Sequence, residues 1–249
     1  MFRSAKLIMS IDKALEALRN GRPIFVFDSE SREGETDMVF ASQFITPEAV
    51  KLMRKGGGGL ICITMPHEAA SVLGLDYLLN IYMRSRMGFI KYLYPSDIPY
   101  GEKSAFSITI NHRKTFTGIT DNDRALTISE FALVVKHALA AKTQQSRAKV
   151  LAEFGKKFRS PGHVFTLVAA KGLFSMRKGH TELTTYLVSR AGLIPSAAIV
   201  EMLADNGLSL DKKSAKEYAR AHGYVFLEGR EIIEAAMHDS AIRQPTPSC

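Results

Sequence analysis

Apolar residues recur at helical spacing in several stretches of the chain, and cap or stop residues mark the ends of these stretches. Ser10 precedes a run whose apolar positions share one face, and Gly21 closes it with Pro23 beyond, which predicts a helix. Similar patterns predict five more helices. One runs from Thr46-Pro47 to the glycines at 56–59, and another begins with a capping box of Thr127 and Glu130. The other three cover about 146–157, 180–192 and 212–222.

Short apolar runs rich in β-forming residues alternate with these helices and predict strands. Alternation within 106–110 puts Phe106, Ile108 and Ile110 on one face, and the run 196–204 fits a strand or a helix, with a strand favoured. The other predicted strands lie at 23–27, at 60–65, in the apolar half of RSPGHVFTLVAA and at 224–227. Because the two kinds of element intermix without a composition break, we predict a single α/β domain over 1–249, with an ordered core at about 10–235 and a disordered tail at 244–249.

Composition and charge narrow the class of protein. A chain of 249 residues with 46% hydrophobic content can bury a large core, and its net charge of +8 favours anionic ligands. The basic residues are scattered, so a phosphorylated small molecule is favoured over nucleic acid, and a nucleotide- or RNA-binding protein is the rival reading. Cys62 and Cys249 give neither a disulfide framework nor a zinc site, and the chain shows no membrane span or signal sequence. We therefore expect a cytoplasmic protein without a membrane partner.

The densest cluster of negative charge follows the first predicted strand. It surrounds Arg32 and consists of Asp28, Glu30, Glu33, Glu35 and Asp37. Gly34 and Thr36 make a helix the poorer choice here, whereas an extended chain would project the last three carboxylates from one side at intervals of about 6.7 Å. Such an arrangement needs a divalent cation, a cationic side chain or a hydroxyl-rich ligand, and the alternative is a solvated acidic loop.

Three other short stretches carry candidate chemistry. The first is RKGHTE, in which Gly179 permits a turn and a helix starts at His180 and Thr181. The free N–H groups of a helix start, together with Arg177, suit a phosphate. His180 also fits a surface histidine without a functional role. His163, which follows Pro161-Gly162 and precedes a strand, suits proton transfer. Glu201 is a lone carboxylate in an apolar run. If this run is a buried strand, Glu201 is a candidate acid or base, and if it is an amphipathic helix, Glu201 is an exposed residue.

Five motifs in this order resemble those of the 3,4-dihydroxy-2-butanone 4-phosphate synthases of riboflavin biosynthesis, from about residue 10 to residue 235. They are FDSESREGETDMVFAS, GGLICITM, FRSPGHVFTLVAA, RKGHTE and IVEML. The resemblance is to the monofunctional form, because the residues after 235 are too few for a fused GTP cyclohydrolase domain. This chain has R-E-G-E-T-D where the family more often has R-E-N-E-G-D, which keeps the charged positions and changes the intervening backbone. The segment 140–158 looks longer than in the compact bacterial form and is assigned no catalytic role.

The resemblance implies a mixed sheet flanked by helices and a carbon–carbon lyase. In that reaction D-ribulose 5-phosphate is enolised, loses water, rearranges its skeleton and loses C4 as formate, giving L-3,4-dihydroxybutan-2-one 4-phosphate. Mg²⁺ is the implied metal, with Mn²⁺ or Zn²⁺ as substitutes and no organic cofactor. The implied assembly is a cytoplasmic homodimer with its sites near the subunit interface.

The resemblance also assigns roles to individual residues. Glu33 and His180 are the implied metal ligands, and His163 and Glu201 are the implied catalytic residues, with Glu35 sharing in proton transfer. The implied substrate-binding residues are Arg32, Glu33, Asp37, Arg177, Lys178, Gly179, His180, Thr181 and Glu201. Cys62 is a core residue by default, although a supporting role near the site is an alternative.

Overall fold

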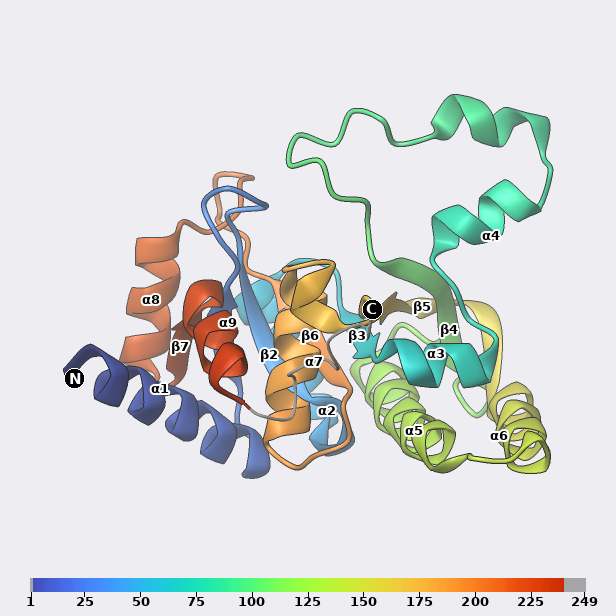
Figure 1. The fold of residues 1–249 in the computed structure, drawn as a ribbon, viewed down its shortest axis with the longest axis horizontal. Helices are drawn as coiled ribbons and strands as arrows, with labels where there is room; N and C mark the ends of the chain where they lie inside the picture. The colour runs from blue at the N-terminus through green and yellow to red at the C-terminus, as the bar shows by residue number, and fades with distance from the viewer. Residues whose placement is uncertain (1, 240–249) are drawn as a thin grey trace, which may run out of the picture.

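Seven strands form one mixed sheet in residues 2–239, the part of the chain that the computed structural model describes (Figure 1). The order across the sheet is β4-β5-β3-β6-β2-β1-β7, in which β1 pairs with β7 and β3 with β5 in parallel and the other neighbours are antiparallel. The strands are β1 Ile24–Phe27, β2 Thr36–Ala41, β3 Cys62–Met65, β4 Phe106–His112, β5 Phe158–Val168, β6 Ala197–Glu201 and β7 Val225–Glu228. The predicted disordered tail at 244–249 lies outside the described residues.

Helices cover both faces of this sheet. One face carries α1 (Phe2–Arg19), α7 (His180–Arg190) and α9 (Gly229–His238). The other carries α2 (Pro47–Leu52), α3 (His67–Leu73), α5 (Asp121–Ala140), α6 (Gln144–Lys157) and α8 (Lys212–Ala221). A segment containing α4 (Leu78–Arg84) and a 3₁₀ turn (Gly88–Leu93) extends away from the rest of the ribbon in Figure 1. None of the helices in residues 2–239 has the length and apolar content needed to cross a bilayer.

The central strands are buried on both faces, which explains why their sequences are continuous apolar runs. In β1, Ile24 and Val26 pack against α1 and α7, while Phe25 packs into the core on the side of α5 and α8. All six residues of β2 are buried as well. The predicted α/β fold with a mixed sheet flanked by helices is therefore confirmed.

Two helices begin earlier than their cap signals predict. Helix α1 already includes Phe2, so Ser10 lies inside it. Helix α5 begins at Asp121, where Thr120 is the N-cap and its hydroxyl accepts a hydrogen bond from the Asp123 N–H at 3.2 Å. Thr127, the predicted cap, lies within α5 and donates to the Asp123 carbonyl instead. Serine and threonine also occur inside helices, where their hydroxyls can bond to backbone carbonyls, so neither residue alone marks a helix start, and both predicted starts were wrong.

A β-bulge in β4 separates side chains that simple alternation puts on one face. The pairing of β4 with β5 shifts register between Phe106 and Thr109. As a result, Phe106 packs against Phe165 on the α7 side, with ring centroids 5.5 Å apart, while Ile108 and Ile110 pack on the α5 side. The prediction of a single face was wrong for Phe106 because an inserted residue reverses the alternation.

The remaining predicted elements are present within a few residues of their predicted ends. The helix from Thr46-Pro47 is α2, which continues as a π-helical turn over Met53–Gly57. The ambiguous run 196–204 contains β6, and the helix after Gly179 is α7. The sequence analysis did not identify β2, α3, α4 or α9.

Candidate active site

A polar cavity of about 540 Å³ opens on the α7 side of the sheet, beside the ends of β2 and β6. Carboxylates and cationic side chains share its lining with apolar residues from β3, β4 and β5. Eight of the residues predicted from sequence line it, namely Arg32, Glu33, Glu35, Asp37, Arg177, His180, Thr181 and Glu201. The cavity thus collects groups from three separate stretches of sequence.

The acidic segment forms a loop organised by Asp28. The buried carboxylate of Asp28 accepts hydrogen bonds from the backbone N–H groups of Glu33 at 3.0 Å and Glu35 at 3.1 Å, and forms an ion pair with Arg32 at 3.1 Å. Residues 28–35 are therefore a turn, and the extended conformation holds only from Thr36 in β2. The expected convergence of Glu33, Glu35 and Asp37 is present, but the loop, and not strand alternation, produces it.

Gly34 explains how the loop accommodates its unusual sequence. Its φ is +68°, in the left-handed region that glycine adopts freely and that asparagine tolerates better than most residues. The family's more common motif has asparagine at this position, so both versions suit the same backbone. The change from R-E-N-E-G-D to R-E-G-E-T-D therefore leaves the charged positions where the cavity needs them.

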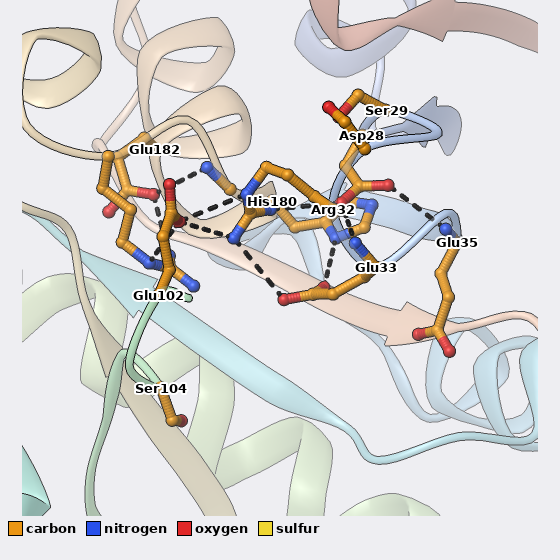
Figure 2. A network of polar contacts seen from close by, with 12 residues as sticks. Asp28, Ser29, Arg32, Glu33, Glu35, Glu102, Ser104, His180 and Glu182 are labelled. Atoms are coloured by element: carbon orange, nitrogen blue, oxygen red, sulfur yellow. Dashed lines mark hydrogen bonds and ion pairs between the residues drawn. The ribbon is translucent and has the colours of Figure 1, made fainter. Parts of the chain in front are cut away.

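His180, at the start of α7, meets Glu33 of the acidic loop from 147 positions away in the sequence. The His180 Nδ1 atom lies 3.2 Å from Glu33 Oε2, and Nε2 lies 3.2 Å from the Val26 carbonyl (Figure 2). Burial lowers the pKa of His180, but Asp37 and Glu33 outweigh it and raise the pKa to about 10. Burial likewise raises the pKa of Glu33, but His180 and the two arginines bring it down to about 2. The pair is thus an imidazolium and a carboxylate in the absence of a metal.

Asp37 and Glu201 lie beside this pair on neighbouring strands. Burial, together with Glu201, Glu33 and Glu35, raises the pKa of Asp37 to about 8, although His180 opposes the shift. Its Oδ1 atom is buried without a hydrogen-bond partner among the described residues and lies 3.8 Å from His180 Nε2. Glu201 Oε2 accepts a hydrogen bond from the Leu60 N–H at 2.7 Å, so the glycine-rich turn before β3 fixes this carboxylate.

Glu182 holds the turn that carries Arg177, and the sequence analysis missed it. Its fully buried carboxylate binds Arg177 Nη1 at 2.8 Å and accepts hydrogen bonds from the N–H groups of Ala170 at 2.9 Å and Gly179 at 3.2 Å. The Gly179 N–H is therefore engaged within the protein, and neither Lys178 nor Gly179 lines the cavity. The Gly-x-x-Glu pattern of a helix start was the available signal for Glu182.

His163 lies outside the cavity of its own chain. It is an exposed residue of β5 that forms two hydrogen bonds with the Asn111 side chain. The His163 backbone N–H donates to Asn111 Oδ1 at 2.8 Å, and His163 Nδ1 lies 3.0 Å from Asn111 Nδ2. The cavity lining does not include it. Of the predicted site residues, His163, Lys178 and Gly179 are the three that the fold does not bring to this cavity.

The donors in the cavity fit a divalent cation. Ligand atoms of Asp28, Glu33 and His180 all lie within 4.8 Å of one another. Asp28 is already committed to two backbone N–H groups and Arg32, whereas Glu33 and His180 face each other, and the buried Asp37 Oδ1 has no hydrogen-bond partner among the described residues. A mixed set of carboxylate oxygens and one imidazole suits Mg²⁺, Mn²⁺ or Zn²⁺.

Residues 12–235 match the family model described as 3,4-dihydroxy-2-butanone 4-phosphate synthase. The chain belongs to this family. A 3,4-dihydroxy-2-butanone 4-phosphate synthase of Methanothermobacter thermautotrophicus is 46% identical over 235 residues, which cover 93% of this chain and 98% of that protein. The riboflavin biosynthesis protein RibBA of Bacillus velezensis is 30% identical over 90% of this chain and 48% of its own length. The family and the enzyme class predicted from the sequence are thus confirmed, and the coverage of the archaeal relative fits the monofunctional form.

A solved structure of the same family extends the comparison to metal binding. It is a 3,4-dihydroxy-2-butanone 4-phosphate synthase in complex with two magnesium ions, with a TM-score of 0.69 and 25% identity, and the match covers 94% of this chain and 99% of that one. Together with the donor set around Glu33 and His180, this likeness supports a divalent metal site in this chain.

Proposed function

We propose that the chain converts D-ribulose 5-phosphate into L-3,4-dihydroxybutan-2-one 4-phosphate and formate. Family membership supports the reaction, and one observation ties it to this cavity: Glu33 and His180 meet at 3.2 Å beside Arg32 and Arg177. The cavity therefore offers ligands for a dication and, beside them, guanidinium groups for a phosphate, with Arg32 Nη2 3.7 Å from Glu33 Oε1. A sugar phosphate with adjacent oxygens near its carbonyl suits both sets of groups.

We assign the metal to Glu33 and His180, with Mg²⁺ as the native ion and Mn²⁺ or Zn²⁺ as substitutes. When bound, the ion acts as a Lewis acid that stabilises negative charge on neighbouring substrate oxygens during enolisation. The Val26 carbonyl accepts the His180 Nε2–H, which fixes the ring and leaves Nδ1 as the ligand atom. Glu33 is a carboxylate before the ion binds, because His180 and the two arginines outweigh burial and hold its pKa at about 2 in the metal-free cavity.

Proton transfers in the proposed reaction fall to the remaining carboxylates. Burial, with the charges of Glu33 and Glu201, raises the pKa of Glu35, and that of Asp37 is about 8. Asp37 can therefore take up and release a proton near neutral pH, and Glu35 holds a proton more readily than an ordinary glutamate. Glu201 stands directly opposite Asp37 and is fixed by the Leu60 N–H, so it presents a positioned carboxylate to the same substrate carbons.

Arg32 and Arg177 are the proposed phosphate ligands, with Thr181 at the start of α7. The two guanidinium groups come from separate parts of the chain and both line the cavity. Binding the phosphate away from the reacting carbons would hold the sugar in register with the metal and the carboxylates.

We further propose a homodimer in which His163 serves the cavity of the second copy. His163 cannot act in its own chain's cavity, because it does not line it. The extended segment around α4 exposes large apolar side chains, including Tyr92 at 79% and Leu93 at 70% exposure, which suit burial against a partner. A second copy would both cover this surface and supply the missing imidazole.

A ribulose 5-phosphate assay that quantifies formate tests the reaction. We expect formate release that stops in EDTA and returns when Mg²⁺ is added in excess, and parallel additions of Mn²⁺ and Zn²⁺ rank the metals. A gel-shift titration addresses the rival nucleic-acid reading, which predicts binding that weakens steeply with salt. Salt-sensitive RNA binding without formate release would reject the proposed function.

A further inference from the structure

Glu102 places one carboxylate between the two arginines of the cavity. Its Oε2 atom lies 2.7 Å from Arg32 Nη2, 3.2 Å from Arg32 Nε and 3.5 Å from Arg177 Nε. Figure 2 shows Arg32 lying between Asp28 on one side and Glu102 on the other. A single anionic oxygen thus draws together two cations that belong to different segments of the chain.

Two other carboxylates bound to these arginines, those of Asp28 and Glu182, are fixed parts of the protein, whereas Glu33, 3.7 Å from Arg32, is the proposed metal ligand. The side chains of Asp28 and Glu182 are fully buried, and each accepts two backbone N–H groups in addition to its arginine. Glu102 differs in both respects. Its side chain is 34% exposed, and its hydrogen bonds and ion pairs in the described structure are all to arginine. It can therefore leave without exposing an unpaired backbone group.

The segment around Glu102 forms one wall of the cavity. Pro99, Tyr100 and Ser104 line the cavity, and the Tyr100 ring lies 5.4 Å from the Arg32 guanidinium carbon. Gly101, with a φ of +75°, makes the turn that aims Glu102 at the arginines. On its N-terminal side the segment leads to the extended region around α4, which lies away from the rest of the ribbon in Figure 1.

We propose that Glu102 is an internal counter-anion that occupies the position of the substrate's phosphate and is displaced when a phosphate monoester binds. This inference rests on the proposed function for the identity of the phosphate ligands. A phosphate dianion and the Glu102 carboxylate cannot share two guanidinium groups already neutralised by Asp28 and Glu182 without like-charge repulsion. Glu102 therefore keeps the arginines aligned in the free enzyme, and its departure lets the wall carrying Tyr100 readjust around the substrate.

Glu102 competes with phosphate for the arginines, so the apparent affinity for phosphate is the intrinsic affinity multiplied by the fraction of molecules in which Glu102 has left the arginines. Replacing it with the neutral isostere in Glu102→Gln should therefore tighten inorganic phosphate binding about three- to tenfold. The matched control is Asp97→Asn, which removes the same charge from an exposed position of the same segment that forms no ion pair or hydrogen bond with either arginine in residues 2–239. This control should leave the phosphate affinity within a factor of two of wild type, since distant exposed charges are screened.

The experiment is a calorimetric titration of the full chain with inorganic phosphate in EDTA, so that no metal contributes, with thermal unfolding to verify that each variant is folded. In parallel, the KM of Glu102→Gln for ribulose 5-phosphate should fall without a rise in kcat. Equal or weaker phosphate binding by Glu102→Gln than by wild type, including no binding by either, would overturn the proposal. Because phosphate binding and formate release are measured separately, a failure of the proposed reaction is distinguishable from a failure of the Glu102 proposal.

Discussion

Asp37 and Glu201 occupy directly opposed positions on the antiparallel strands β2 and β6, so both carboxylates project from the same face of the sheet. Like charges in this arrangement repel, and the repulsion contributes to the raised pKa of Asp37. The pair is tolerated because His180 lies within 3.8 Å of Asp37 and the Leu60 N–H binds Glu201. The sheet thus holds acidic groups together that would separate in a flexible segment, and proton transfer chemistry needs them together.

Glu33→Gln or His180→Ala should reduce metal-dependent formate release by at least about a hundredfold, because each removes a direct ligand of the proposed dication. Circular dichroism should show that both variants stay folded. The matched control is Glu30→Gln, which changes an exposed carboxylate of the same loop that forms an ion pair with Lys212. Turnover near the wild-type rate in either ligand variant, under saturating metal, would reject the metal assignment.

Gly59→Ala should lower kcat about tenfold or more by displacing Glu201, since small misplacements of reacting groups are costly. A Cβ atom on Gly59 would lie 2.4 Å from Glu201 Oε2 and 2.8 Å from Glu201 Cβ. The control is Gly155→Ala in α6, where a Cβ meets nothing within 4 Å. That change should leave formate release unchanged and slightly stabilise the protein. An unaltered kcat in Gly59→Ala would show that the position of Glu201 does not limit the reaction.

Mixing two inactive variants tests whether His163 acts across subunits. His163→Ala and Glu33→Gln should each abolish activity alone, because each leaves both sites of a homodimer defective. After co-refolding, half of the dimers combine one chain of each kind and contain one intact site, so about a quarter of wild-type formate release should return. Sedimentation analysis of the mixture verifies the dimers. An active His163→Ala protein, or no recovery in a mixture that forms dimers, contradicts the role given to His163.

The metal-free protein should lose stability as the pH rises from 6.5 to 10. His180 has a folded pKa of about 10 against an ordinary value of 6.5, so its stabilising contribution is complete below 6.5 and disappears as the pH passes through 10. Urea unfolding in EDTA at pH 6.5 and pH 9.5 measures the difference, and His180→Gln should show a smaller one. Identical pH dependence in the two proteins would mean that His180 is not protonated in the folded state.

Local patterns predicted elements well where one signal dominates. Continuous apolar runs predicted β1 and β3, which are fully buried, and also the partly buried edge strand β7, and Gly179 marked the start of α7. The sequence could not show the strand order, which depends on pairings between residues as distant as Asp37 and Glu201. The predicted site residues mostly converge, yet Asp28, Glu102 and Glu182 were missed as arginine partners. Only the contact of Glu102 with Arg32, across 70 positions of sequence, lacks a local pattern; Asp28 lies four residues from Arg32 and Glu182 five from Arg177, and the backbone N–H groups that these two carboxylates accept appear only in the fold.

The bulge in β4 makes the two sides of the sheet independent at this edge. Because the shifted register turns Phe106 towards the cavity and leaves Ile110 in the opposite core, a change of size at Phe106 reshapes the substrate's surroundings without loosening the packing beneath α5. Without the extra residue, both side chains would share one face, and every adjustment of the binding surface would also be a change in the hydrophobic interior. Variation in ligand fit and conservation of the scaffold can therefore coexist on a single strand.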